Sequence, residues 1–161
     1  AMRRLKEQGD YRLILLGSGE LREKLVEQAQ RSDIDRIVDF AGFVQNPAAY
    51  FRKADVVALS SRFEGLPTVL VEALAVGAKV VSTDCPSGPR EILQNGKFGI
   101  LVKPENPEAL ADGILRGLAW EPDRGALRQR ALDFTDRRAA EEYLRVIRET
   151  IMQHAERRKR A

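Results

Sequence analysis

Short runs of Leu, Ile and Val, each of strand length and each followed by a segment of helical character, constrain the fold of this chain most strongly. They are "RLILL" at 12–16, "RIVDF" at 36–40, "DVVALSS" at 55–61, "AKVVST" at 78–83 and "GILV" at 99–102. None keeps the strict apolar and polar alternation of a half-solvated strand, so we expect a parallel sheet covered on both faces. The alternation of strands and helices predicts an α/β, Rossmann-like domain with three layers.

Local signals place the helices between these strands. Residues 1–9 have the pattern of the end of an amphipathic helix that stops at Gly9. Proline and asparagine mark helix starts, and Gly77 marks a helix end. The further helices are expected at 20–31, with Leu21, Leu25, Val26 and Ala29 on one face, at 46–54, at 67–76, at 89–96, from Asn106 onward, and at 136–157.

Composition and charge exclude several classes of protein. The chain has 161 residues, a length that suits one domain, and a single cysteine, Cys85, so it forms no internal disulfide. Its net charge is +3, but no nucleic-acid-binding motif accompanies the basic residues. Leu66 to Val81, the most apolar stretch, is too short to span a bilayer.

These features predict a cytoplasmic protein that does not bind nucleic acid. The basic tail "HAERRKRA" at 154–161 could touch anionic lipid at the inner membrane face, although a solvated helix end explains it more simply. His154 is expected at the surface.

The loops that follow the strands are where ligands bind in such sheets. Gly17, Ser18 and Gly19 follow the first strand, and their small size lets the backbone approach a phosphate or sugar. A dinucleotide fingerprint would need a third glycine where the chain has Arg22, so NAD binding is not supported. A tight strand-to-helix turn explains the glycines equally well.

The helix expected at 67–76 has only two polar side chains, Thr68 and Glu72. Because the rest is apolar, we expect this helix to be buried, and a buried carboxylate needs hydrogen-bond donors. A ligand hydroxyl or the backbone amides of a neighbouring loop could supply them.

The start of the same helix predicts an anion site. Pro67 suits the first helical position, and Leu66 before it has no side-chain oxygen with which to cap the helix. Open N–H groups at the positive end of a helix, next to the flexible Gly65, suit a diphosphate. Glu64 would then face hydroxyls or a developing positive charge, and a glycosyl donor offers both.

These residues carry a resemblance. "EGLP" at 64–67, with Glu72 eight residues after Glu64, resembles the "EGxP" and Glu-x7-Glu signature of retaining GT-B glycosyltransferases. The segments "LILLGSGELREKL", "FAGFVQNPAAYF", "CPSGPREILQNGKFGILV" and "PENPEALADGI" are similar, in this order, to the C-terminal donor-binding domain of glycosyltransferase family four. The match covers nearly all of residues 1–161.

The resemblance implies transfer of a sugar from a nucleotide diphosphate donor, with retention, in a cleft between two Rossmann-like domains. It implies that Glu64 lies near the donor sugar and stabilises oxocarbenium character, and that Glu72 holds the ribose hydroxyls. It assigns the remaining donor contacts to the backbone at Gly65, Leu66, Pro67 and Thr68, to Val69 at the ribose, to Phe43 and Val44 at the base, and to the loop Gly17, Ser18 and Gly19.

The resemblance also has consequences for cofactors and for the rest of the protein. The sequence has no histidine cluster, and the resemblance implies that neither a metal nor another cofactor is needed and that the nucleotide sugar is a substrate. "CPSGPREIL" is similar to enzymes of bacterial surface glycan synthesis that use UDP-linked donors.

The family's phosphate-binding Arg and Lys, and its N-terminal domain that binds a glycan or lipid-linked acceptor, would precede residue 1. We therefore expect a fragment that turns over no donor alone, with Tyr143, Ile147 and Ile151 of the last helix exposed.

Two other functions remain open. The chain could be a binding or assembly module that has lost catalysis, although intact Glu64 and Glu72 argue against this. A GT-B sugar-nucleotide epimerase or phosphorylase would share the fold, but its motifs fit "EGLPTVLVEAL" less well.

Overall fold

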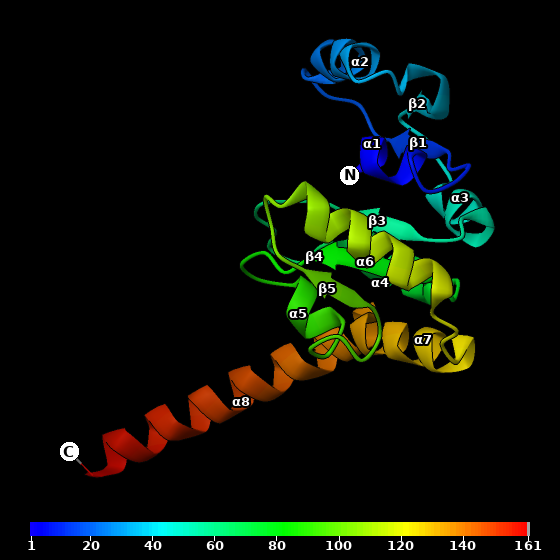
Figure 1. Cartoon of the computed structure of the whole chain (residues 1–161). Coiled ribbons are helices and arrows are strands. Elements are labelled where there is room, and N and C mark those ends of the chain that lie inside the picture. Colours follow the sequence, from blue (N-terminus) through cyan, green and yellow to red (C-terminus); the bar gives the residue numbers. More distant parts are fainter. Residues whose placement is uncertain (161) are drawn as a thin grey trace.

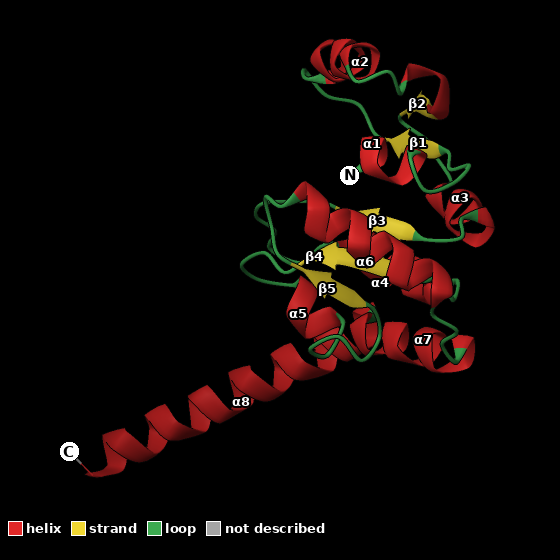
Figure 2. Ribbon diagram, viewed as in Figure 1, coloured by secondary structure: helices red, strands yellow, loops and turns green. Residues whose placement is uncertain are grey.

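The computed structural model describes residues 1–160, with side chains as far as His154. Helices and strands alternate through most of it, so the α/β fold class is confirmed (Figure 2). The strands are β1 (Leu13–Leu16), β2 (Val38–Gly42), β3 (Val57–Leu59), β4 (Val80–Thr83) and β5 (Ile100–Val102). The helices are α1 (Met2–Lys6), α2 (Arg22–Arg31), α3 (Pro47–Lys53), α4 (Thr68–Ala75), α5 (Pro89–Ile92), α6 (Pro107–Ala119), α7 (Arg124–Ala131) and α8 (Asp136–Arg160), with 3-10 turns η1 (Asp35–Ile37) and η2 (Leu132–Phe134).

All strand pairs are parallel, but the strands form two sheets where the sequence predicts one (Figure 1). The smaller sheet has the order β1-β2, and the larger has the order β3-β4-β5. β4 is buried throughout, as expected for a strand covered on both faces. The same expectation is wrong for Ile14 in β1, which is 45% exposed, and for Ala58 in β3, which is also exposed.

Helices cover both faces of the larger sheet. Successive residues of β4 point to opposite faces, and all of them are buried. Val80 belongs to the main core cluster, with Leu70 and Leu74 of α4 and with Leu127 of α7. On the other face α6 lies very close to the strands: a Cβ added at Gly113 would stand 2.5 Å from Val102 Cγ1. The larger sheet is thus the middle layer of a three-layer unit (Figure 1).

Most predicted helix ends are confirmed to within two residues. Asn106 caps α6 by accepting a hydrogen bond from the Ala109 N–H, and Gly77, with φ +74°, ends α4. The helix expected to stop at Gly9 instead ends at Lys6. The helix α8 extends to Arg160, three residues further than expected.

The apolar face predicted for α2 is only partly covered. Ala29 is buried and Val26 is half-buried, but Leu21 is 60% exposed and Leu25 is 44% exposed. Leu21 lies just before the helix, which starts at Arg22. The apolar side chains of α2, which lies beside the β1-β2 sheet in sequence, are therefore more exposed than the sequence predicts.

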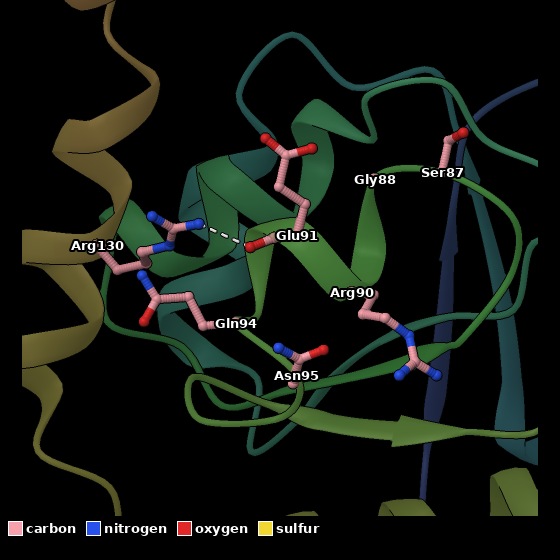
Figure 3. A pocket seen from close by; sticks show the side chains of 7 residues that line it. All are labelled: Ser87, Gly88, Arg90, Glu91, Gln94, Asn95 and Arg130. Carbon is pink, nitrogen blue, oxygen red and sulfur yellow. Dashed lines mark hydrogen bonds between the residues drawn. The ribbon is translucent and has the colours of Figure 1, made fainter.

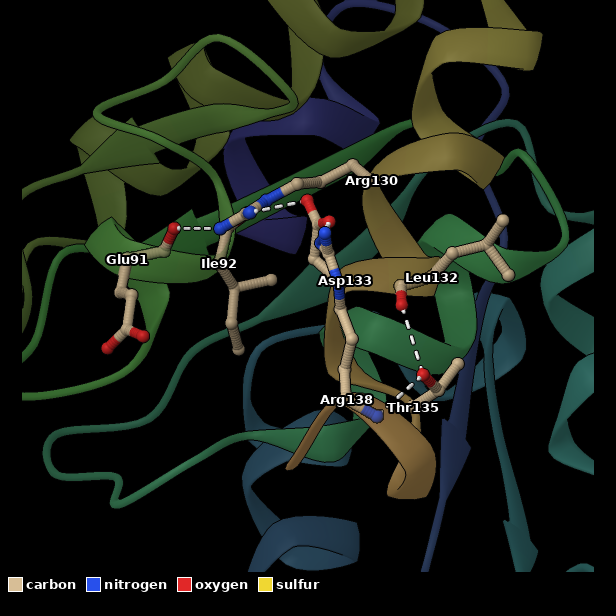
Figure 4. A network of polar contacts seen from close by, with 7 residues as sticks. All are labelled: Glu91, Ile92, Arg130, Leu132, Asp133, Thr135 and Arg138. Carbon is tan, nitrogen blue, oxygen red and sulfur yellow. Dashed lines mark hydrogen bonds and ion pairs between the residues drawn. The ribbon is translucent and has the colours of Figure 1, made fainter. Parts of the chain in front are cut away.

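Arg130 of α7 joins three elements at the base of α8 (Figure 4). Its guanidinium donates to the Glu91 carbonyl at 2.7 Å and to the Ile92 carbonyl at 2.9 Å, at the end of α5. It also pairs with Asp133, at 2.9 Å, and Arg138 of α8 holds the other carboxylate oxygen of Asp133. The hydrogen bond from Arg130, followed by that from Arg138, lowers the pKa of the Asp133 carboxyl below its ordinary value.

Arg130→Ala is expected to lower the free energy of unfolding by about 2 kcal/mol, because the side chain is only 11% exposed and three acceptors lose their donor. Urea unfolding of this chain measures the change. Arg137→Ala is the matched control, since that side chain is 89% exposed and makes a single i,i+4 pair with Glu141. Equal losses in the two variants would show that the Arg130 contacts do not stabilise the fold.

The helix α8 extends away from the rest of the molecule (Figure 1). Tyr143 is 72% exposed, Ile147 52% and Ile151 63%, so the prediction for these residues is confirmed. His154 is exposed, as expected. The side chains of the basic tail at 155–161 lie outside the described residues. Within residues 1–160, no helix has both the length and the apolar character needed to cross a membrane.

Candidate functional site

The loop between β3 and α4 places Glu64 by a chain of two hydrogen bonds. Thr83, buried at the end of β4, donates its hydroxyl to the Ser61 carbonyl at 2.6 Å. Ser61 in turn donates its hydroxyl to Glu64 Oε1 at 2.7 Å. Glu64 is half-buried, and its second carboxylate oxygen has no protein donor among the described hydrogen bonds. One oxygen of Glu64 is thus fixed while the other remains available to a ligand.

The N-terminus of α4 is open, as the sequence predicts, but it begins one residue later. Pro67 is the N-cap, with φ −70° and ψ 87°, and Thr68 is the first helical residue. Pro67 has no side-chain hydrogen bond to offer, and its carbonyl already accepts from the Leu70 N–H at 3.0 Å. The N–H groups of Thr68 and Val69 have no acceptor within the helix. This end of α4 can therefore bind an anion.

Glu72 is exposed, so the expectation that it lies on a wholly buried helix is wrong. Thr68 and Glu72 are four residues apart and share the exposed face of α4, whereas Leu70 and Leu74 on the other face are fully buried. No described hydrogen bond joins Glu72 to a neighbouring loop. Its carboxylate is therefore open to solvent, and no internal partner competes with a ligand for it.

Gly17 and Phe43 lie together at the end of the smaller sheet. The Gly17 N–H donates to the Gly42 carbonyl at 2.7 Å, which brings the loop of Gly17, Ser18 and Gly19 next to Phe43 and Val44. Gly17 has φ +119°, a backbone conformation that favours glycine. Phe43 is 78% exposed, so its ring is free to pack on a ligand.

The predicted site residues therefore form two groups, one on each sheet. The first group follows β1 and β2, and the second, from Glu64 to Glu72, follows β3. Among the side chains described through His154, no hydrogen bond or ion pair joins the two groups.

Sequence reasoning missed the support that the loop after β4 gives to the second group. Gly88, with φ +81°, packs so closely that an added Cβ would stand 2.3 Å from Pro67 Cδ and 2.7 Å from the Gly65 carbonyl oxygen. The only local sign of this close approach is the glycine in the "SGP" sequence at 87–89. The sequence does not show which loop that glycine contacts.

The same loop borders an open pocket of about 780 Å³ (Figure 3). Its lining residues are Ser87, Gly88, Arg90, Glu91, Gln94, Asn95 and Arg130. Both arginines are already paired, Arg90 with Asp84 and Arg130 with Asp133 and two carbonyls. The pocket therefore offers no uncompensated positive charge to an anion.

The residues described here contain no group of His, Cys, Asp and Glu side chains that could hold a metal ion. The available chemistry is that of a helix N-terminus, exposed backbone N–H groups and two carboxylates.

Comparison with known proteins identifies the family of the chain. The family model of glycosyl transferases group 1 matches residues 1–134. The chain is 34% identical over 122 residues to N-acetylgalactosamine-N,N'-diacetylbacillosaminyl-diphospho-undecaprenol 4-alpha-N-acetylgalactosaminyltransferase of Campylobacter jejuni; the match covers 76% of this chain and 33% of that protein.

Solved structures show the same fold. A glycosyltransferase from Rickettsia africae has a TM-score of 0.81 at 18% identity, with 93% of this chain and 42% of that one covered. HepE from Anabaena in complex with UDP has a TM-score of 0.71 at 23% identity, with 94% of this chain and 44% of that one covered. The chain thus spans about a third of the Campylobacter relative and less than half of these structures. It belongs to the glycosyl transferases group 1 family and has the fold of GT-B glycosyltransferases.

Proposed function

We propose that residues 1–161 form the donor-binding half of a retaining glycosyltransferase that uses a UDP-linked sugar. The observation that carries the proposal is the open N-terminus of α4 next to the partly free carboxylate of Glu64. A nucleotide sugar needs an anion site for its diphosphate and, next to it, a hydrogen-bond acceptor for its sugar hydroxyls. The start of α4 would supply the first and Glu64 the second.

The donor would lie across both groups of site residues. The diphosphate would accept hydrogen bonds from the N–H groups of Thr68 and Val69, where the positive end of α4 balances part of its charge. Glu72, one turn further along the exposed face, would accept hydrogen bonds from the ribose hydroxyls. Phe43, which is 78% exposed, would pack on the base. This arrangement requires no metal or cofactor.

The reaction would break the bond between the sugar anomeric carbon and the diphosphate oxygen. The acceptor oxygen would form its new bond to the same face of that carbon, and the acceptor proton would pass to the departing diphosphate. Glu64 would stabilise the positive charge that develops on the sugar. The acceptor-binding half would come from the part of the protein that precedes residue 1.

Selective binding of UDP tests the proposal. Calorimetric titration of this chain with UDP, GDP and ADP is expected to show weak binding of UDP alone. Glu72→Ala should weaken that binding by at least about tenfold, because the carboxylate would lose its hydrogen bonds to the ribose. Glu27→Ala, on the exposed surface of α2, is the matched control and should leave binding unchanged.

Each titration result has a distinct meaning. Loss of UDP binding in both variants would point to a general effect of charge and would contradict the role of Glu72. If none of the three nucleotides binds to this chain or to the whole protein, the proposal of a donor site is wrong.

We further propose a role in the synthesis of surface glycans at the cytoplasmic side of the membrane. The name of the Campylobacter relative gives it a diphospho-undecaprenol acceptor. We accordingly propose that the whole protein to which this chain belongs uses a lipid-linked or glycan acceptor.

A further inference from the structure

We propose that the open pocket beside the loop after β4 binds neutral sugar units of the acceptor glycan. The pocket is lined by this loop, by α5 and the turn that follows it, and by Arg130 of α7 (Figure 3). Its volume of about 780 Å³ lies within the range of about 300–1,000 Å³ that small-molecule sites occupy. That the sugar belongs to an acceptor rests on the proposed function, whereas the sugar-binding chemistry rests on the pocket itself.

The pocket presents polar side chains that are free to bind a ligand. Four of its lining residues are exposed, namely Ser87, Glu91, Gln94 and Asn95. Their side chains take part in no hydrogen bond or ion pair described through His154, and Glu91 contributes only its backbone carbonyl, to Arg130. The hydroxyl and the two carboxamides offer both donors and acceptors, and the carboxylate offers acceptors. This mixture suits sugar hydroxyls, each of which can donate and accept a hydrogen bond.

The charges around the pocket favour a neutral ligand. Arg90 is held by Asp84, with Nε 3.1 Å from Oδ1. Arg130 donates to two backbone carbonyls and to Asp133. Both arginines are thus compensated, whereas the Glu91 carboxylate has no cationic partner in the part of the chain that the structure describes. A phosphate or carboxylate in the pocket would be repelled by Glu91, and a neutral glycan would not.

The backbone conformation of three of these residues is a second indication of a ligand site. Ser87, Gln94 and Asn95 have φ values of +66°, +45° and +55°. Glycine adopts this left-handed region without strain, and residues with a side chain adopt it at a cost. The chain nevertheless carries a hydroxyl and two carboxamides at these positions, all of them at the pocket. Backbone strain of this kind is typical of sites that bind ligands.

The pocket lies beside the loop that carries Glu64. Gly88 lines the pocket and is buried, and a Cβ added to it would stand 2.7 Å from the Gly65 carbonyl oxygen. The loop after β4 therefore forms a wall between the pocket and the proposed donor site. We assign the sugar in the pocket to the acceptor, because the donor sugar is placed at Glu64, on the other side of this wall.

A variant that combines Ser87→Gly, Gln94→Gly and Asn95→Gly tests the pocket without changing its backbone. Glycine adopts the positive φ of all three positions, so the variant loses the polar side chains and keeps the course of the chain. Asp33→Gly is the matched control, because Asp33 has φ +52° and lies outside the pocket.

Titration of this chain with lactose, maltose and N,N'-diacetylchitobiose, followed by backbone amide NMR, measures sugar binding. At least one of these neutral disaccharides should shift the amide signals of residues 87–95. The triple glycine variant should bind it at least about tenfold more weakly, and Asp33→Gly should bind it as the unchanged chain does. Digalacturonate, a disaccharide with two carboxylates, should bind more weakly than the neutral sugars. No shift at 87–95 with any neutral disaccharide, or equal binding by the triple variant or of digalacturonate, would overturn the inference.

Kinetics of the whole protein distinguish the acceptor from the donor. The triple glycine variant should raise the KM for the acceptor by at least about tenfold and change kcat and the donor KM by less than about twofold. A rise in the donor KM alone, or sugar-induced shifts confined to residues 64–72, would overturn the assignment to the acceptor. Sugar binding at 87–95 without any binding of UDP would reject the proposed donor site and keep the sugar pocket. Binding of UDP without any sugar-induced shift at 87–95 would reject the pocket alone.

Discussion

Glu64→Gln in the whole protein is expected to lower the rate of the proposed sugar transfer by at least about 100-fold. Glutamine has the size of glutamate and can still accept the hydrogen bond that Ser61 donates to Oε1 at 2.7 Å. The variant therefore keeps the shape of the loop and loses only the negative charge. If Glu64 stabilises positive charge on the sugar, that charge is the catalytic contribution, and the loss should appear in kcat.

Transfer is measured as UDP release and as formation of the glycosylated acceptor by the purified whole protein. The binding of UDP by residues 1–161 is the control, and it should change by less than about twofold, because the neutral side chain of Glu64→Gln leaves the contacts of Thr68, Val69 and Glu72 in place. Ser61→Ala keeps the charge and removes the hydrogen bond that orients it, so a smaller loss of about tenfold is expected.

Unchanged transfer by Glu64→Gln would contradict a catalytic role for Glu64. A whole protein that transfers no sugar in either form but retains its binding partners would instead support the binding or assembly module.

The strands were predictable because their signal is local. Short apolar runs such as "VVST" at 80–83 need no knowledge of their neighbours, and the caps at Asn106 and Gly77 are equally local. The division into two sheets was not predictable in the same way. It depends on which strands pair, and a short apolar run does not specify its partner strand.

In the candidate site, too, local features could be predicted from the sequence and contacts between distant segments could not. The open helix start after Pro67 follows from the residues themselves, because neither Leu66 nor Pro67 has a capping oxygen. The prediction for Glu72 was wrong because α4, although mostly apolar, is buried on one side only. Thr68 and Glu72, four residues apart, instead mark its exposed face.

The contacts of Thr83 and Gly88 with the loop at 60–67 could not be predicted, since they join segments that only the parallel pairing of β3 and β4 brings together.

Gly88→Ala is expected to lower the free energy of unfolding of this chain by about 3 kcal/mol, through two effects. Gly88 has φ +81°, where alanine is strained by about 1 kcal/mol. The added Cβ would also stand 2.3 Å from Pro67 Cδ and 2.7 Å from the Gly65 carbonyl oxygen, so backbone or proline ring must move at a further cost of about 2 kcal/mol.

Gly96→Ala separates these effects, because Gly96 has φ +96° but an added Cβ would find its nearest neighbour, the Gly99 carbonyl oxygen, at an ordinary 3.6 Å. Urea unfolding should show a loss of about 1 kcal/mol for this control. UDP binding should weaken in Gly88→Ala and stay unchanged in Gly96→Ala, since Pro67 moves in only one of them. Equal stability losses and equal UDP affinities in the two variants would mean that the loop after β4 does not position the start of α4.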